Sequence, residues 1–365
     1  MSLGSVLVIG GCGLLGHHIV KYLLESGEAT SITVFDISTK FNRYPGVHYI
    51  NGSIASIEDI SSALKESKAE TIFNTASPDP LTASKRMLEN VNIVGTQNVL
   101  DCAMEYGIKV LVHTSSSEVV QNSYDDMIWI KESSPLPESP VDGSVYAKTK
   151  QVGENLVLKA NGTNGLLTVA IRLCTIFGEG DRILMPHIVE LARSGRARYH
   201  IGTGKNLYDF IYAGNAAEGH VLAAGKLVDA SLSQGAKRKN KVDGEAFFMT
   251  NGDPWPFWDF SRSVAREIGR PIADKEIWRI PLVLVYFFLS IFEWVYWVVT
   301  MGGQPRVTYR MLRYTVQVRT FDITKAKERL GYRPRISMEE GLRRTVSCHI
   351  ASSVTNDNSR SLYAS

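Results

Sequence analysis

The chain has 365 residues, of which 44% are hydrophobic and 21% charged, and its formal net charge is +3. These values fit one large or two modest globular domains, and a charge so near zero argues against a nucleic-acid partner. Four scattered cysteines without a CxxC motif predict reduced thiols, with neither a disulfide framework nor a metal site.

Short apolar runs alternate with helical patterns through the first half of the chain. The start, MSLGSVLVIGG, has no basic segment before its apolar run, so we expect a buried strand there and no signal peptide. Further strands are expected at SITVFDIS, ETIFNTAS, KVLVHTSSSEVV and LTVAIRLCTIFG, with helices such as LLGHHIVKYLLES and YAKTKQVGENLVLKA between them. This rhythm predicts an α/β protein with a doubly wound parallel (Rossmann) sheet.

The strand–helix rhythm weakens after Gly178, where Pro- and Gly-rich joints interrupt the chain. We therefore expect a dinucleotide-binding domain over 1–178 and a smaller C-terminal substrate domain over 179–350, with EAFFMTN returning a strand to the main sheet. The basic run KRKNK at 237–241 is expected to be a solvated loop, with contact to an anionic membrane as the alternative. A disordered tail is expected over 351–365.

The glycines of VLVIGGCGLLG satisfy both GxxGxxG and GxGxxG. Glycine there lets the backbone turn tightly against a pyrophosphate, and the following helix supplies free N–H groups. Asp36 ends the second predicted strand, twenty residues after Gly16. Its carboxylate can accept hydrogen bonds from a ribose 2′-OH and would repel a 2′-phosphate, which favours NAD over NADP. A turn residue is the alternative interpretation of Asp36, and Lys40 and Arg43 lie nearby.

Tyr146 and Lys150, in YAKTK, lie one helical turn apart and share a face, although such a pair often only decorates a helix surface. A lysine ammonium and an oxidised nicotinamide would favour the phenolate, and lowering the phenol pKa by ~3 units takes ~4 kcal/mol. Thirty residues upstream, TSSSEV ends a predicted strand, where α/β sheets bind ligands. Any of Ser115, Ser116 and Ser117 could hydrogen-bond the reacting oxygen, and the other two would be plain strand-end residues.

The glycine loop, Asp36, TSSSEV, YAKTK and IFGEGD, in this order, resemble the extended short-chain dehydrogenase/reductase superfamily over residues 5 to about 347. The resemblance implies that Ser116 is the catalytic serine, that Tyr146 is the acid/base, and that Lys150 holds the nicotinamide ribose. It also implies a water relay from Asn92 to the lysine. The cofactor-binding residues expected from the pattern and the resemblance are Gly10, Gly13, Leu14, Leu15, Gly16, Asp36, Ser53, Ile54, Ala76, Tyr146 and Lys150.

Two positions depart from the superfamily pattern. Leu173 stands where a proline is usual, and Ser53 stands where relatives commonly carry an adenine-binding Asp. The second departure predicts a weakened or reshaped contact with adenine.

GTGKNLYDFIYAGNAAEGHVLAA and TNGDPWPFWDF resemble the 3β-hydroxysteroid dehydrogenase branch, and in particular the decarboxylating sterol-4α-carboxylate 3-dehydrogenases. The resemblance implies NAD-dependent oxidation of the 3β-hydroxyl of a 4-carboxysterol or related triterpenoid, with loss of the carboxylate as CO2. A homodimer is a candidate assembly. The alternatives are a non-decarboxylating dehydrogenase or isomerase of another alcohol, including nucleotide-sugar enzymes, and a non-catalytic NAD sensor.

Residues 280–301, IPLVLVYFFLSIFEWVYWVVTM, carry Glu293 as their only formal charge. Such a helix would extend about 33 Å, enough to span a bilayer core, and its aromatic end suits a membrane interface. The following TFDITKAKERLGYRP resembles the closing part of the folded enzyme, which a span would place across the membrane from its own domain. We therefore expect a monotopic or re-entrant segment on a cytosol-facing endoplasmic reticulum membrane or lipid surface. A core helix and a true span are the alternatives.

Overall fold

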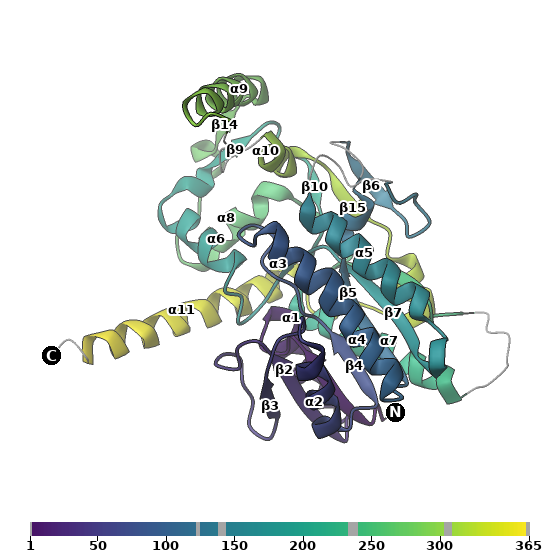
Figure 1. Ribbon diagram of the computed structural model, residues 1–365. Helices are drawn as coiled ribbons and strands as arrows, with labels where there is room; N and C mark the ends of the chain where they lie inside the picture. Colours follow the sequence, from purple (N-terminus) through teal and green to yellow (C-terminus); the bar gives the residue numbers. More distant parts are fainter. Residues whose placement is uncertain (1, 122–124, 138–143, 233–239, 303–308, 363–365) are drawn as a thin grey trace.

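The structure is a computed structural model that describes residues 2–121, 125–137, 144–232, 240–302 and 309–362 (Figure 1). Its centre is a seven-stranded sheet in the order β12-β7-β5-β4-β1-β2-β3, in which every neighbouring pair is parallel. The strands are β1 (Ser5–Ile9), β2 (Ser31–Asp36), β3 (His48–Asn51), β4 (Thr71–Asn74), β5 (Val110–Ser116), β7 (Leu167–Leu173) and β12 (Glu245–Met249). The predicted doubly wound α/β fold is confirmed.

Helices cover both faces of the sheet (Figure 1). Along β1, Val6 and Val8 join one apolar cluster, whereas Leu7 and Ile9 join another, because successive strand residues point to opposite faces. Helices α1 and α7 pack on the first face, and α2, α4 and α5 on the second. Their bounds are α1 (Leu14–Ser26), α7 (Ala213–Leu232), α2 (Ile57–Ser67), α4 (Thr96–Glu105) and α5 (Val145–Ala160).

A third apolar cluster holds the C-terminal part together. Phe177, Phe210, Phe260 and Leu342 are buried in it. The helices around it are α6 (Leu184–Arg193), α8 (Phe257–Glu267) and α11 (Met338–Leu362). Strand β12 comes from the predicted second domain and pairs in parallel with β7 of the first, and the domain bounds stay a prediction.

Short strands and turns complete the described structure. The smaller sheets contain β6 (Met127–Ile130), β8 (Thr175–Phe177), β9 (Tyr199–Ile201), β10 (Leu207–Tyr208), β11 (Phe210–Tyr212), β13 (Trp255–Pro256), β14 (Trp278–Ile280) and β15 (Arg319–Phe321). Short helical pieces are α3 (Lys85–Glu89), η1 (Asn90–Gly95), η2 (Ser117–Val120), η4 (Thr163–Gly165), η5 (Arg196–Arg198), η6 (Asp274–Glu276), α10 (Tyr309–Val316) and η7 (Ala326–Leu330). Within the basic run 237–241, residues 237–239 lie outside the described residues.

Helix α11 continues to Leu362, so the structure is helical in most of the segment 351–365 that was predicted to be disordered. The helix leaves the body of the molecule as it continues (Figure 1). Its first turns pack in the third cluster, and extending an existing helix needs no new nucleus, even for a Ser- and Asn-rich sequence. Residues 363–365 lie outside the described residues.

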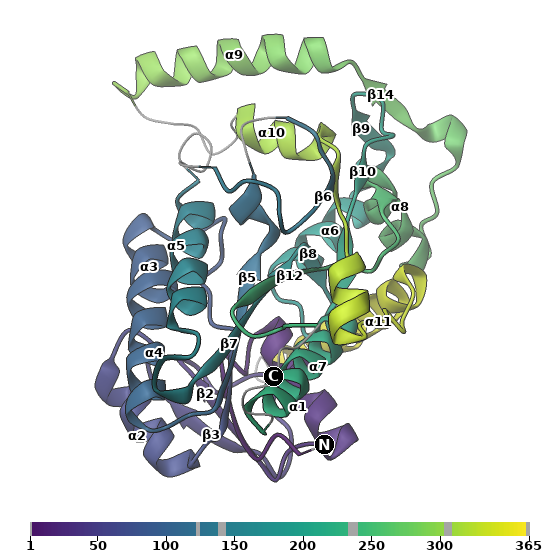
Figure 2. The ribbon, with the colours of Figure 1, turned by 90° about the vertical axis from the view of Figure 1, so that its right-hand side faces the viewer.

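The apolar segment forms helix α9 (Leu282–Val299), and none of its residues is buried. The helix lies across one end of the molecule, with α10 between it and the main sheet (Figure 2). It is the one helix of the described residues that is long and apolar enough to cross a membrane, which by length and composition alone is weak evidence. The alternative of a core helix is wrong, because the protein would bury such a helix and no residue of α9 is buried.

Candidate active site

The glycine loop between β1 and α1 packs so closely that side chains would not fit at its glycine positions. A Cβ at Gly16 would lie 2.2 Å from the Gly10 carbonyl oxygen, and one at Gly10 would lie 2.8 Å from the Ala76 nitrogen. Gly10 also has φ +77°, a conformation that favours glycine. Leu14 and Leu15 open helix α1 directly after the loop. These glycines let the loop pack against α1 and the end of β4, at the β1–β4 break in strand order where such sheets bind dinucleotides.

The Asp36 carboxylate lies over this loop at the end of β2. Its Oδ2 accepts a hydrogen bond from the Cys12 N–H at 3.0 Å, and its Oδ1 accepts one from Ser38 N–H at 3.1 Å. The Asp36 carboxylate thus stabilises its own turn through Ser38 and also contacts the glycine loop through Cys12. A carboxylate that binds the adenosine ribose must lie beside this loop. Burial, and then the charge of Asp36, raise the pKa of the Cys12 thiol to about 11, so this thiol stays protonated at neutral pH.

The region expected to receive adenine follows β3. The Ser53 N–H donates to the Asp59 Oδ2 at 2.8 Å, and the buried Ile54 lies against Gly95, where a Cβ would come within 2.7 Å of it. The Ser53 hydroxyl accepts a hydrogen bond from the Ala55 N–H at 3.2 Å. Its place in adenine binding stays a prediction.

Tyr146 lies in the first turn of α5, whose N-cap is the Ser144 hydroxyl. The hydroxyls of Ser116 and Ser77 lie near enough to its phenol to lower the Tyr146 pKa. Ser115, in contrast, donates to the buried Glu154 carboxylate at 2.6 Å. Of the three candidate serines, Ser116 is therefore the one that acts on Tyr146. Sequence reasoning missed Ser77, although it ends the predicted strand ETIFNTAS, much as Ser116 lies near the end of another.

Burial, followed by the charge of Glu118, raises the pKa of Tyr146, while the Ser116 and Ser77 hydroxyls lower it. In the protein without cofactor the pKa of Tyr146 is therefore raised, whereas Lys150 and a nicotinamide were expected to lower it. Burial disfavours the phenolate, and it outweighs the hydrogen bonds. Lys150 Nζ donates to the Thr114 carbonyl at 2.5 Å, and burial lowers the pKa of Lys150 to about 8.

Asn92 lies in the π-helical turn η1, a type of turn that is frequent at functional sites. Its Oδ1 accepts from the Ser77 hydroxyl at 3.2 Å, and its Nδ2 donates to the Thr149 Oγ1 at 3.0 Å. A Cβ at Gly153 would lie 2.5 Å from the Asn92 carbonyl oxygen, so α5 approaches the turn closely. The structure thus connects Asn92 to Tyr146 through Ser77, and the relay to Lys150 stays a prediction.

Two sets of residues near the site were missed because no motif marks them. The fully buried Glu154, which accepts from Ser115, pairs with Arg172 at 2.6 Å. Glu118 and Tyr314 lie close enough to Tyr146 to raise its pKa. No cluster of three or more His, Cys, Asp or Glu side chains suited to a metal occurs among the described residues. The four cysteines are free thiols.

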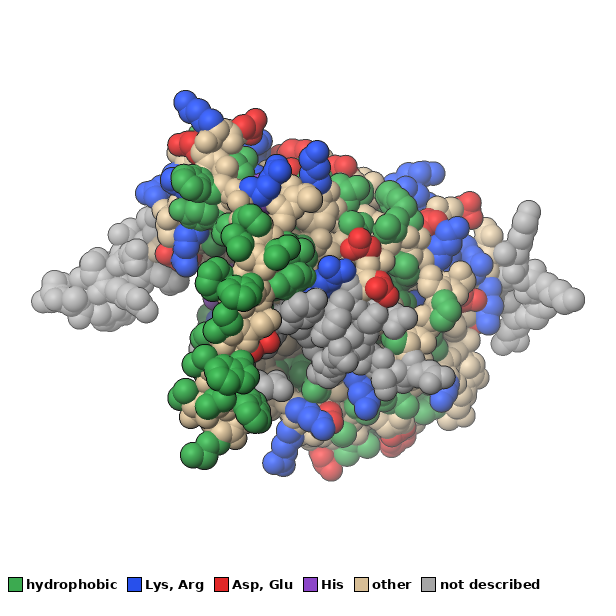
Figure 3. Space-filling model, turned by 90° about the horizontal axis from the view of Figure 1, so that it is seen from above, with side chains coloured by type: hydrophobic (Ala, Val, Ile, Leu, Met, Phe, Trp, Pro, Cys, Tyr) green, Lys and Arg blue, Asp and Glu red, His purple; other side chains and the backbone are tan. Residues whose placement is uncertain are grey.

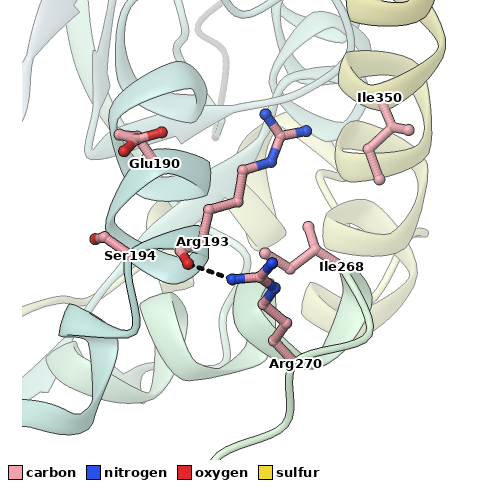
Figure 4. Close-up of a pocket in the computed structure, with 6 residues that line it drawn as sticks. All are labelled: Glu190, Arg193, Ser194, Ile268, Arg270 and Ile350. Atoms are coloured by element: carbon pink, nitrogen blue, oxygen red, sulfur yellow. Dashed lines mark hydrogen bonds between the residues drawn. The ribbon is translucent and has the colours of Figure 1, made fainter.

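A surface hollow of about 440 Å³ lies away from these residues, between α6, α8 and α11 (Figure 4). It is lined by Glu190, Arg193, Ser194, Ile268, Arg270 and Ile350. The Arg270 guanidinium donates to the Arg193 carbonyl across it. None of the predicted site residues lines this hollow.

Residues 7–282 match the model of the 3-beta hydroxysteroid dehydrogenase/isomerase family. The chain belongs to this family. Within it, the chain is 36% identical over 359 residues to the decarboxylating sterol-4-alpha-carboxylate 3-dehydrogenase of Saccharomyces cerevisiae, covering 95% of this chain and 98% of the relative. It is 35% identical to the Mus musculus protein of the same name, over 93% and 89% of the two chains.

Solved structures agree on the fold of this 3-beta hydroxysteroid dehydrogenase/isomerase family member. The UDP-glucose 4-epimerase of Thermotoga maritima aligns with a TM-score of 0.69 at 21% identity, over 95% of this chain and 99% of that chain. The Thermus thermophilus UDP-glucose 4-epimerase, in complex with NAD, aligns with a TM-score of 0.67 at 20% identity, over 94% and 98%. At these identities the likeness concerns the fold alone.

Proposed function

We propose that the protein oxidises the 3β-hydroxyl of a 4-carboxysterol with NAD and releases the C4 carboxylate as CO2. The observation that carries the proposal is that Tyr146, at the start of α5, lies near Ser116, at the end of β5, where the Ser116 hydroxyl lowers the pKa of the phenol. It occurs in a chain that is 36% identical to a decarboxylating sterol-4-alpha-carboxylate 3-dehydrogenase. Hydrophobic alcohols without a carboxylate are the alternative substrates.

The residues at the carboxyl edge of the sheet fit NAD. The glycine loop has no room for Cβ atoms and would hold the pyrophosphate, and Asp36 would accept hydrogen bonds from the adenosine ribose. On the nicotinamide side, the buried Lys150 would hold the second ribose. When bound, NAD supplies the acceptor for the hydride that leaves C3.

Tyr146 and Ser116 perform the proton chemistry in this proposal. Both hydroxyls bind the substrate oxygen, and the Tyr146 phenolate takes its proton as the C3–H bond breaks. The phenol keeps this proton while the carboxylate is lost and then releases it through the Ser77 hydroxyl, which lies near Tyr146 and donates to Asn92 Oδ1 at 3.2 Å.

Decarboxylation needs no further residue. Oxidation makes C3 a ketone β to the C4 carboxylate, so the C4–carboxyl bond can break and leave its electrons as an enolate. The negative charge develops on the C3 oxygen, where Tyr146 and Ser116 donate hydrogen bonds. Protonation at C4 then completes the 3-ketone.

We further propose that α9 lies flat on a lipid surface. The half-buried positions of the helix recur at helical spacing on one face, which includes Leu282, Leu289 and Glu293. The outer positions are exposed and apolar, as at Phe287 and Phe288, which are 59% and 65% exposed. Seen from this end of the molecule, apolar side chains gather in a row along one edge (Figure 3). A helix that turns its single carboxylate inward and a broad apolar surface outward suits an interface rather than a span.

Tyr146→Phe tests the chemical assignment. The variant keeps the ring but loses the hydroxyl, so NADH formation with the carboxysterol should fall at least about 100-fold while NAD affinity stays unchanged. Tyr106→Phe is the matched control, because it removes a phenol hydroxyl bonded to Ser61 at 2.6 Å, at the end of α4. Substantial turnover by Tyr146→Phe would exclude Tyr146 as the acid/base.

A further inference from the structure

The substrate that we propose places a negative charge next to the reacting atom. The carboxylate is on C4, one bond from C3, so its receptor must face the same space as Tyr146 and Ser116. This inference rests on the proposed function and asks which residue receives that charge.

Groups from η2 and α10 lie near Tyr146. Helix η2 starts directly after Ser116, whose hydroxyl accepts from the Glu118 N–H at 3.2 Å, and Glu118, like Tyr314 of α10, raises the pKa of Tyr146. The Tyr314 hydroxyl donates to Gln121 Oε1 at 2.9 Å. The same oxygen accepts from Arg319 Nη1 at 2.9 Å. Arg319 is therefore joined to the substrate space through Tyr314 and Gln121.

Arg319 is a buried cation without an acid in contact. It is 2% exposed, and no carboxylate oxygen of the described residues lies within 4.0 Å of its guanidinium. The other arginine buried in a strand, Arg172, pairs with Glu154 at 2.6 Å. Glu118 is the acid that acts on Arg319 from nearby. A buried charge that lacks a close partner is unfavourable, so this site gains from an anion.

Neutral groups hold the guanidinium in place. Its centre lies 4.6 Å from the Tyr314 ring centroid and 5.6 Å from that of Tyr208. Strand β15, which carries Arg319, is paired with β10 on one side and β6 on the other. Aromatic faces and an amide fix the orientation of a guanidinium without neutralising it, which keeps its charge available for a ligand.

We propose that Arg319 binds the C4 carboxylate of the substrate and selects 4-carboxysterols over neutral 3β-hydroxysterols. A guanidinium can bind a carboxylate through two parallel hydrogen bonds, which also orients the ring system toward Tyr146. Loss of CO2 removes this anion, so the ketone product is held less tightly than the substrate. Arg319 is a substrate-binding residue in this account and takes no part in proton or hydride transfer.

The test compares a 4α-carboxy-3β-hydroxysterol with its methyl ester, which keeps the reacting hydroxyl but has no charge. The readout is the ratio of kcat/KM for acid to that for ester, measured by NADH formation in wild type and Arg319→Gln. The ratio should fall about 10- to 100-fold in the variant, chiefly through the KM of the acid. An unchanged ratio overturns the proposal, even if both activities drop, because a merely structural role affects acid and ester alike.

Two further variants test the same proposal if Arg319→Gln does not fold. Gln121→Glu places a carboxylate against the guanidinium and should lower the acid-to-ester ratio by occupying Arg319. Glu118→Gln removes a negative charge that faces the same space and should raise the ratio. Movement of either ratio in the opposite direction contradicts the proposal. Failure of the wild type to oxidise the acid at all refutes the proposed function instead, which separates the two results.

Discussion

Ser115 and Ser116 are neighbours in β5 whose hydroxyls do different things. Ser116 acts on the Tyr146 phenol, whereas Ser115 donates to the buried Glu154. Ser116→Ala should therefore lower kcat about 100-fold, and it also removes the cap of η2, where the Ser116 hydroxyl accepts from the Glu118 N–H at 3.2 Å. Ser115→Ala should mainly lower the free energy of unfolding, by about 1–3 kcal/mol, because a buried carboxylate loses a donor.

Steady-state kinetics and denaturant unfolding of both variants check this division. Equal loss of kcat in the two variants, or loss of kcat only in Ser115→Ala, would contradict it.

Spacing in the sequence was sufficient to find Asp36, Tyr146 and Lys150 as candidates, because each lies in a short motif. It left three serines open, and strand geometry separates two of them, since successive residues point to opposite faces. Ser77 and Tyr314 could not be found as neighbours of Tyr146. They lie 69 and 168 positions from it in the sequence, and only the folding of separate strands, loops and helices brings them near.

At the scale of elements, the outer face of α9 carries the clearest prediction. Phe287→Glu with Phe288→Glu should weaken binding to vesicles about 100-fold or more, because two exposed aromatic side chains would no longer enter lipid. NAD affinity should not change. Co-sedimentation with vesicles measures this directly.

The matched control puts the same charges on exposed apolar residues elsewhere, Leu81→Glu with Met87→Glu, which are 68% and 52% exposed in wild type. The control should still sediment with vesicles. If both double variants behave alike, α9 has no special role at the lipid surface.

Six strands of the main sheet were predictable because each is a short apolar run bounded by a turn or a glycine. The seventh, β3, was not predicted, because this edge strand reads HYIN and none of its residues is buried. The surroundings of residues 280–301 could not be predicted, since an apolar run does not indicate whether protein or lipid covers it. Only the packing of α9 against the rest of the molecule decides against a core helix. The conformation of the segment after residue 350 likewise depends on the rest of the fold, because the first turns of α11 are packed in the third apolar cluster.

For the whole molecule, buried neutral histidines predict a loss of stability in acid. Burial lowers the pKa of His18 to about 3 and that of His220 to about 4, from 6.5, and also lowers that of the fully buried His113. The unfolded chain therefore binds more protons below pH 6.5, so stability is full above that pH and falls below it. Each histidine contributes a loss of about 1.4 kcal/mol per pH unit between the two pKa values.

Buried acids oppose this trend, because burial raises the pKa of Glu132, Asp181, Asp209 and Glu218. Burial raises the pKa of Asp209 from 3.8 to about 7, so its contribution to stability grows as pH falls from 7 toward 4. The three strongly shifted histidines outnumber the one acid whose pKa is raised to about 7, so the thermal midpoint should drop as pH falls from 6.5 to 5. A midpoint that rises over this interval would show that the histidines are not held neutral.

The most direct test of the central claim incubates the purified protein, in detergent, with NAD and a 4α-carboxy-3β-hydroxysterol, and follows NADH and CO2 together. We predict that both rise in step, one CO2 for each NADH, and that Tyr146→Phe produces neither. NADH without CO2 would contradict decarboxylation and leave a 3β-alcohol dehydrogenase. Neither signal from the wild type would contradict the proposed substrate altogether.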